Sequence, residues 1–280
     1  MQAPIKDYEA EYNNRARVPN HASVIASWEE QSVQWRENAY KADLDLAYGA
    51  GTRHKVDVFS PENEAAGPIV MFIHGGYWQA LGREWFSHMA RGPNLNGITV
   101  AVPSYDLCPN VSVSQITEEM QACCLWLWKT YRRRIVVCGH SAGGHLTACM
   151  LATDWNAHDG DAPPLLVGAG LSISGLFDLE PLVPTTINDN LQLTSESARK
   201  ASPIHWAPPS GLKMIAAVGG EESSEYLRQS KDIAKAWHTQ GMAVMARVLP
   251  GENHFSIVAS LAEKDGVLTK TLTGLVSGAT

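Results

Sequence analysis

Short apolar runs alternate along this chain with longer segments of helical periodicity. The segment "HKVDVFSP" (54–61) alternates polar and apolar residues, which is typical of a half-buried strand. Other apolar segments end in turn residues, as strands buried on both faces do. These predicted strands are 68–76, 98–105, 134–139, 165–175, 213–220 and 243–251.

The segments between the strands favour helices. From 114 to 131 the apolar period becomes helical, and one face carries Ile116, Met120, Cys123, Cys124, Leu127 and Tyr131. Helices are also predicted over 145–153 and 225–240, the latter stopped by Gly241, and a closing helix is predicted after His254. Repeated strand–helix alternation indicates an α/β fold with a mainly parallel, doubly wound sheet and helices on both faces.

The whole chain, 1–280, is predicted to form one domain, because it contains no repeat or Pro/Gly-rich linker that would divide it. Residues 1–40 form a polar, helix-prone arm that precedes the sheet. This arm is a candidate lid over the carboxyl edge of the strands.

Composition restricts the class of partner. The formal net charge is −7, which argues against a nucleic acid or an anionic membrane surface as the main partner. The basic run Arg132–Arg134 is predicted to lie at a solvated helix end, and no apolar segment is long enough to cross a bilayer. The cysteines lack metal-ligand spacing, and Cys123 and Cys124 are predicted to fill the core. A reducing, cytoplasmic compartment is therefore expected.

The chemistry of the chain centres on "GHSAG" at 139–143. This segment fits G-x-S-x-G and lies between a predicted strand and a predicted helix, which is the context that the motif requires. There a serine sits on a strained turn at the carboxyl edge of the sheet, and small neighbours let the helix pack closely. The alternative is a tight turn with an incidental serine, but motif and context agree. Ser141 is therefore the candidate nucleophile.

A serine hydroxyl needs a base beside it, and in this fold the chain order is serine, acid, histidine. His254 lies in a turn-forming segment directly after the last predicted strand, on the same edge as Ser141. The other histidines weighed for this role are His145, His158, His205 and His238. His254 could also be a histidine of a surface loop, but its position in the chain order favours the role of base.

The acid is expected after the strand 213–220. Glu221, Glu222 and Glu225 all follow that strand, and acidic residues also gather at helix N-termini for reasons of the helix dipole alone. Asp178 follows an earlier strand and is expected to cap a helix. Chain order does not separate Glu221 from Glu222.

A second glycine-rich turn, "HGGYW" at 74–78, ends an earlier strand. An oxyanion hole takes one N–H from the residue after the nucleophile, here Ala142, and others from such a loop. Gly76 and Tyr77 are the expected donors. A metal site at His140 and His145 is disfavoured because no carboxylate or cysteine ligand set accompanies them, and the predicted chemistry needs no cofactor.

The pair "HGGYW" and "GHSAGGHL" resembles the kynurenine formamidase (arylformamidase) branch of the α/β-hydrolases, which is related more distantly to hormone-sensitive-lipase-like carboxylesterases. The likeness runs from about residue 48 to 254 and includes "YDLCP" and "SEYLRQS". It implies an α/β-hydrolase fold and a triad of Ser141, Glu222 and His254. The resemblance also implies an aspartate as the acid of the animal enzymes, so the glutamate of this chain is a departure from them.

The resemblance implies hydrolysis of a small-molecule aryl formamide or carboxylic ester through an acyl-enzyme. Two other functions were weighed: a general carboxylesterase for short acyl or aryl esters, and a non-catalytic binding protein, a class in which the serine or histidine is usually lost. Four aromatic residues flank the catalytic segments and are expected to line the substrate pocket, although core packing is the competing role for the second and third: Tyr77, Trp78, Tyr105 and Phe255.

Overall fold

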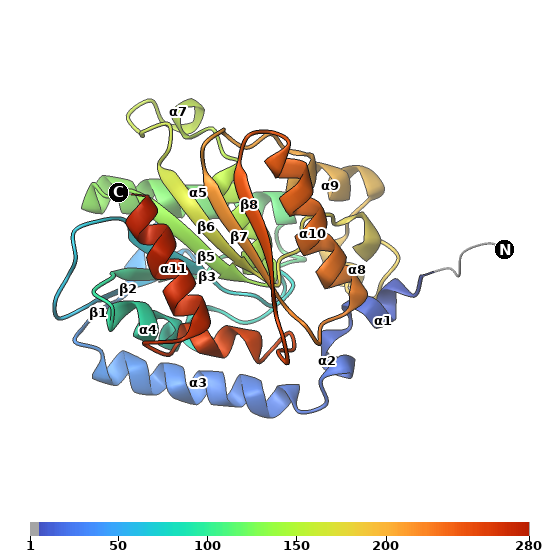
Figure 1. The fold of residues 1–280 in the computed structure, drawn as a ribbon, viewed down its shortest axis with the longest axis horizontal. Helices are drawn as coiled ribbons and strands as arrows, with labels where there is room; N and C mark the ends of the chain where they lie inside the picture. The colour runs from blue at the N-terminus through green and yellow to red at the C-terminus, as the bar shows by residue number, and fades with distance from the viewer. Residues whose placement is uncertain (1–5, 280) are drawn as a thin grey trace.

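The computed structural model describes residues 6–279, so the first five residues of the predicted arm lie outside the described part of the chain. A single twisted sheet runs through the molecule, with helices on both sides of it (Figure 1). Its strand order is β1-β2-β4-β3-β5-β6-β7-β8. The strands are β1 (Lys41–Ala47), β2 (Lys55–Ser60), β3 (Ile69–Ile73), β4 (Val100–Pro103), β5 (Ile135–His140), β6 (Val167–Ile173), β7 (Lys213–Gly219) and β8 (Ala243–Leu249).

The sheet is parallel from β4 to β8, and β2 pairs antiparallel with both β1 and β4. The prediction of a mainly parallel sheet is confirmed. The α-helices are α1 (Tyr8–Tyr12), α2 (Asn14–Arg17), α3 (His21–Asn38), α4 (Arg91–Asn94), α5 (Val113–Tyr131), α6 (Ala142–Leu151), α7 (Trp155–His158), α8 (Asn188–Leu191), α9 (Ser195–Lys200), α10 (Ser224–His238) and α11 (Val267–Gly278). Short 3-10 turns span Arg83–Trp85, Ser87–Ala90, Glu180–Leu182, Pro203–His205 and Ile257–Leu261.

Two hydrophobic cores form, one on each face of the sheet. One core contains apolar residues of α5, α6 and α10, and the other contains residues of α3 and α11. Strand β3 shows why: Met71 belongs to the first core and its neighbours Val70 and Phe72 belong to the second. Since successive side chains of a strand point to opposite faces, a continuously apolar strand must be covered on both sides.

The predicted elements are largely confirmed. The apolar face of α5 is buried, including Cys123 and Cys124, and Arg132 caps the end of that helix in a left-handed conformation. Two details go beyond the prediction. The sequence did not predict strand β1, an edge strand that pairs with β2 and contains no fully buried residue. The closing helix follows His254 as predicted, but a 3-10 turn comes first and the helix begins at Val267, after Gly266.

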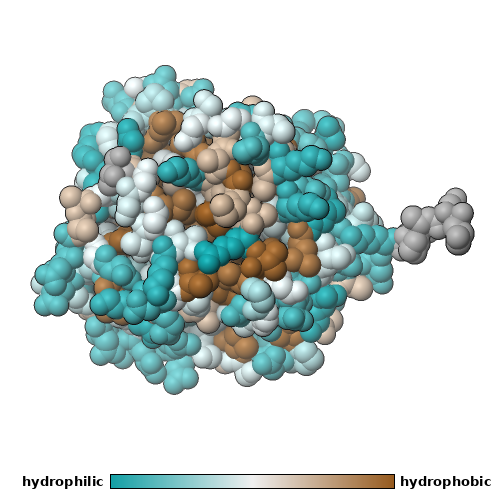
Figure 2. All heavy atoms as spheres, in the orientation of Figure 1, coloured by the Kyte–Doolittle hydropathy of each residue, from teal (hydrophilic) through white to brown (hydrophobic). Residues whose placement is uncertain are grey.

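The surface of the described residues is largely hydrophilic. Figure 2 shows polar side chains over most of one face, with apolar side chains in a band across its middle. Exposed large hydrophobic residues include Met245 and Val248 on β8 and Val267 at the start of α11. Within residues 6–279, no helix combines the length and apolar character that crossing a membrane requires.

Candidate active site

Ser141 occupies a strained turn between β5 and α6. Its backbone angles are φ 57° and ψ −116°, a region that non-glycine residues rarely adopt. The flanking glycines are required by space, since a Cβ on Gly139 would lie 2.2 Å from the carbonyl oxygen of Gly143, and one on Gly143 would lie 1.9 Å from that of Ile73. The G-x-S-x-G segment therefore holds α6 tightly against β5 and β3 and lifts the serine above the sheet edge.

His254 and Glu222 reach this serine from two other loops. His254 follows β8, and its Nε2 lies 3.0 Å from Ser141 Oγ. Its Nδ1 lies 2.7 Å from Oε2 of Glu222, which follows β7. All three residues are buried. The structure thus brings together the three residues that the sequence suggested, in a geometry in which His254 can accept the hydroxyl proton and Glu222 can hold the ring.

Glu222 is itself held on its second oxygen. Oε1 accepts hydrogen bonds from the Gly219 N–H at 2.7 Å and from the Ser174 hydroxyl at 2.5 Å. Each carboxylate oxygen therefore has a donor, which fixes the orientation of the group toward His254. Sequence reasoning missed Ser174. The feature of the sequence that could have suggested Ser174 is its position at the carboxyl end of β6, the strand next to β5.

The competing acids lie elsewhere. Glu221 is exposed, and its backbone N–H donates to the carbonyl of Glu252. Glu225 is buried on α10 and accepts hydrogen bonds from Tyr12 and Arg228. Asp178 does not cap a helix as predicted, because Leu179 is the residue before the 3-10 turn; the Asp178 side chain accepts a hydrogen bond from the N–H of Glu180 at 3.3 Å.

The other histidines are also placed away from the serine hydroxyl. His145 is buried on α6, and its Nε2 contacts the carbonyl oxygen of Ala201 at 2.7 Å. His158, His205 and His238 are exposed at or near the ends of helical segments and do not line the cavity described below.

The predicted oxyanion donors lie on the two loops that meet at the serine. Ala142 is the first residue of α6, and Gly76 and Tyr77 follow β3 with φ of 113° and 49°. A Cβ on Gly75 would lie 3.0 Å from the Cβ of Ser141, so this loop approaches the serine closely. Among the described residues, the N–H groups of Gly76, Tyr77 and Ala142 have no intramolecular acceptor. They are available to an oxyanion.

His140 was considered only as a metal ligand, but it contacts the loop of the candidate base. Its Nε2 lies 2.8 Å from the carbonyl oxygen of His254. Burial lowers the pKa of His140 to about 3, and the neighbouring His254 adds to this. A neutral ring can meet that carbonyl only with the proton on Nε2, so His140 donates a hydrogen bond that anchors His254.

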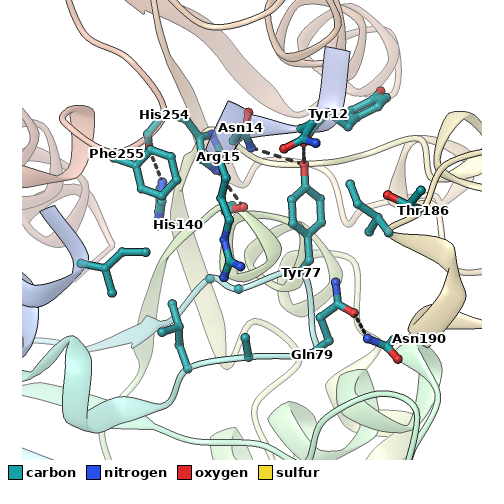
Figure 3. A pocket seen from close by; sticks show the side chains of 18 of the residues that line it. Tyr12, Asn14, Arg15, Tyr77, Gln79, His140, Thr186, Asn190, His254 and Phe255 are labelled. Carbon is teal, nitrogen blue, oxygen red and sulfur yellow. Dashed lines mark hydrogen bonds between the residues drawn. The ribbon is translucent and has the colours of Figure 1, made fainter. Parts of the chain in front are cut away.

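A cavity of about 610 Å³ opens onto Ser141 and His254, a size typical of small-molecule sites. Tyr77 and Phe255 line it, as the sequence suggested (Figure 3). The arm lines it as well, through residues of α1, α2 and α3 and the residue that joins the first two: Glu9, Tyr12, Asn13, Asn14, Arg15, Ile25 and Trp28.

The expectation for Trp78 and Tyr105 needs correction. Neither lines this cavity, and both side chains have no exposed surface. Trp78 packs edge-on against His145 at 5.0 Å between ring centroids, and Tyr105 stacks on His74 at 4.1 Å. Their position next to the catalytic segments reflects core packing beneath the loops, because strand-end aromatics can turn inward as well as outward.

The residues that could bind a metal ion lie outside the cavity. Within residues 6–279, ligand atoms of two groups come close enough to hold an ion: His54, Asp106 and Glu119, and Asp178, Glu180 and His205. Neither group contains His140 or His145, and neither contributes to the lining around Ser141.

Comparison with known proteins agrees with the fold and identifies the family. Residues 70–204 match the family model for the alpha/beta hydrolase fold. The chain is 33% identical to a kynurenine formamidase of Salmo salar over 82% of this chain and 80% of that protein, and 29% identical to one of Danio rerio over 91% and 88%. A provisionally assigned thioesterase from a Silicibacter species superposes with a TM-score of 0.82 at 32% identity, covering 96% of this chain and all of that one.

The family match includes the serine turn, and the curated relatives, which cover most of the chain, are hydrolases. The chain is accordingly an α/β-fold hydrolase, and it belongs to the kynurenine formamidase branch of the α/β-hydrolase family.

Proposed function

We propose that this enzyme is a serine hydrolase of aryl formamides, with Ser141, His254 and Glu222 as its triad. The observation that carries the proposal is the continuous hydrogen-bonded path from Ser141 Oγ through His254 to Glu222, at 3.0 and 2.7 Å. The similarity to kynurenine formamidases of fish supports the formamide as substrate.

The first chemical step is attack of Ser141 Oγ on the formyl carbonyl. His254 Nε2 accepts the hydroxyl proton, and the imidazolium that forms is stabilised by Glu222, which also keeps the proton on Nδ1. The carbonyl oxygen becomes an oxyanion, which the N–H groups of Ala142, Gly76 and Tyr77 stabilise. Each such donor typically lowers the barrier by about 3 kcal/mol.

Collapse of the tetrahedral intermediate breaks the carbon–nitrogen bond. The leaving aryl amine takes the proton from His254, and the formyl group remains esterified to Ser141. Water then attacks this ester with His254 again as the base, releasing formate and restoring the serine. No step in this scheme requires a cofactor.

A general carboxylesterase acting through the same residues is the second candidate. This candidate is supported by the 32% identity to the Silicibacter protein, which is described provisionally as a thioesterase and would therefore cleave an ester-like bond. Turnover of N-formylkynurenine compared with p-nitrophenyl acetate separates the two. A formamidase should have the higher kcat/KM for the formamide, and an esterase should hydrolyse only the ester at a useful rate.

Ser141→Ala is the decisive variant for the mechanism. It should lose nearly all turnover of both substrates while keeping the wild-type melting temperature, and full activity would refute the scheme. A non-catalytic binding role predicts that even the wild-type chain hydrolyses neither compound.

The arm is proposed to act as a fixed wall or lid of the cavity, because α1, α2 and α3 all contribute lining residues. We also propose a reducing, cytoplasmic compartment, which the five free and buried cysteines support.

A further inference from the structure

The cavity lining carries an uneven set of charges. Its carboxylates are Glu9 and Asp189, and Arg15 is the one lining residue in the described chain with a permanent positive charge. Glu9 is already engaged, because it accepts hydrogen bonds from the N–H and the hydroxyl of Thr186, both at 2.8 Å. Asp189 would repel an anion. Among the described lining residues, Arg15 is therefore the charged side chain suited to an anionic part of a substrate.

Arg15 is unpaired within the described part of the chain, and it is an exposed residue. Within residues 6–279 its guanidinium makes no hydrogen bond and no ion pair, although the chain contains many carboxylates. Figure 3 shows the side chain extending into the cavity, between Tyr77 and the pair His140 and His254. A free guanidinium aimed into a substrate cavity offers five N–H donors to a ligand.

The segment that leads into Arg15 is anchored by hydrogen bonds to two other parts of the cavity wall. Asn14, its neighbour, donates to the hydroxyl of Tyr226 at 2.9 Å. The carbonyl of Tyr12 accepts from the hydroxyl of Tyr77 at 2.7 Å, and Tyr77 belongs to the proposed oxyanion loop. The arm is thus bonded to the same loop that approaches the nucleophile. This arrangement holds the Arg15 backbone near the reacting carbonyl, while its exposed side chain remains free to reach a ligand.

We propose that Arg15 binds a carboxylate on the leaving group of the substrate and so determines specificity for acidic aryl formamides or esters. The planar guanidinium can hold both carboxylate oxygens at once, which an ammonium cannot. The anion must be on the leaving group, because a formyl group has no room to carry one. This inference rests on the proposed function and adds the residue that selects among its substrates.

The test compares N-formylkynurenine with its neutral α-carboxamide, which differs only at the carboxylate. Wild type should prefer the acid. Arg15→Ala should reduce the acid-to-amide ratio of kcat/KM by about 10- to 100-fold, mainly through KM of the acid, as expected for loss of a charge-assisted hydrogen bond. Arg15→Lys, which keeps the charge but not the fork, should give an intermediate ratio.

The matched control is Arg17→Ala. Arg17 lies on the same short helix but does not line the cavity, so its loss should leave the ratio at the wild-type value. Melting temperatures of the variants should match that of wild type. An equal loss for acid and amide in Arg15→Ala, or a wild type with no preference for the acid, would overturn the assignment.

The proposed formamidase activity can fail separately. If wild type hydrolyses p-nitrophenyl acetate but neither formamide, the same comparison is made with 3-acetoxybenzoate and 3-acetoxybenzamide. The Arg15 inference then stands if Arg15→Ala removes a preference for the benzoate, and it falls if wild type has none. Loss of all ester hydrolysis in Ser141→Ala remains the independent test of the mechanism.

Discussion

The hydroxyl of Ser174 lies 2.5 Å from Oε1 of Glu222, on the side of the carboxylate opposite His254. Ser174 comes from the end of β6 with φ of 51°, and Glu222 comes from the loop after β7. The orientation of the proposed triad acid is therefore set by a neighbouring strand as well as by its own loop. This supports treating Ser174 as a positioning residue.

Ser174→Ala should lower kcat by about 10-fold with little change in KM, since it removes one hydrogen bond to a charged group but leaves the Gly219 N–H in place. Steady-state kinetics and a pH–rate profile check this. The matched control is Ser172→Ala, because the hydroxyl of Ser172 donates to the carbonyl of Gly144 and not to Glu222. Equal rate losses in the two variants would make the Ser174 effect a general consequence of altering β6.

Glu222→Gln should reduce kcat by about 10³- to 10⁴-fold with little change in KM, because the amide favours the wrong tautomer of His254. Glu221→Gln should stay close to wild type, since Glu221 is exposed and uses only its backbone here. Glu222→Asp should be partly active at best, its carboxylate falling short of the ring. Steady-state kinetics on the three variants test this assignment. A large loss of kcat in Glu221→Gln would show that Glu221, and not Glu222, is the triad acid.

Gly143→Ala should abolish the native turn, because its new Cβ would lie 1.9 Å from a backbone oxygen that cannot move freely. We expect insoluble or inactive protein and a loss of several kcal/mol of stability if any folds. Gly274→Ala is the control, with nothing within 4 Å of the added Cβ on α11. It should raise stability by up to about 1 kcal/mol through helix propensity alone.

The docking of the arm can be weakened at one buried hydroxyl. Tyr12 has no exposed surface, donates to Glu225 at 2.7 Å and accepts from Gln229 at 2.7 Å. Tyr12→Phe should cost about 1–3 kcal/mol of unfolding free energy, since both partners are left buried with fewer bonds. Denaturant unfolding measures this. An unchanged midpoint would show that the arm is held by other contacts.

An arm that acts only as a lid would, when deleted, change substrate affinity more than melting temperature. This arm is also packed into the core, because Trp28 lies on Phe86 and Phe255 with ring centroids 5.2 and 6.0 Å apart. Removing residues 1–40 would uncover this core, so a lower melting temperature as well as a higher KM is expected.

Buried neutral histidines predict sensitivity to mild acid. Burial lowers the pKa of His74 and His140 to about 3 and that of His145 to about 4. Between these values and about 6.5, the unfolded chain binds protons that the folded chain does not, so stability falls as pH falls. Each such histidine contributes a slope of about 1.4 kcal/mol per pH unit in this window.

Urea unfolding at pH 7, 6 and 5 measures this slope. His145→Gln, which retains a side-chain donor toward Ala201, should reduce the slope by about one proton. A slope that is equally steep in this variant would show that His145 takes up a proton without unfolding.

The local pattern of the sequence determined the strands, the main helices, the serine turn and the order of serine, acid and histidine. These features depend on neighbours in the chain: apolar runs specify buried strands, and the glycines around Ser141 are required by contacts within a few residues or with the adjacent strand. Strand β1 was not predicted from the sequence, because a partly exposed edge strand has little apolar pattern to recognise.

Chain order left open which of two adjacent glutamates faces His254, and only the family resemblance favoured Glu222; the tertiary structure places it there. Tertiary structure alone decided that Trp78 and Tyr105 turn into the core and that Ser174 contacts the acid. These relationships join loops that are far apart in sequence, and a shift of one residue in a loop turns its side chain elsewhere. Hydrophobic periodicity carries no information about that direction. It is fixed only when β6, β7, β8 and the arm meet at one edge of the sheet.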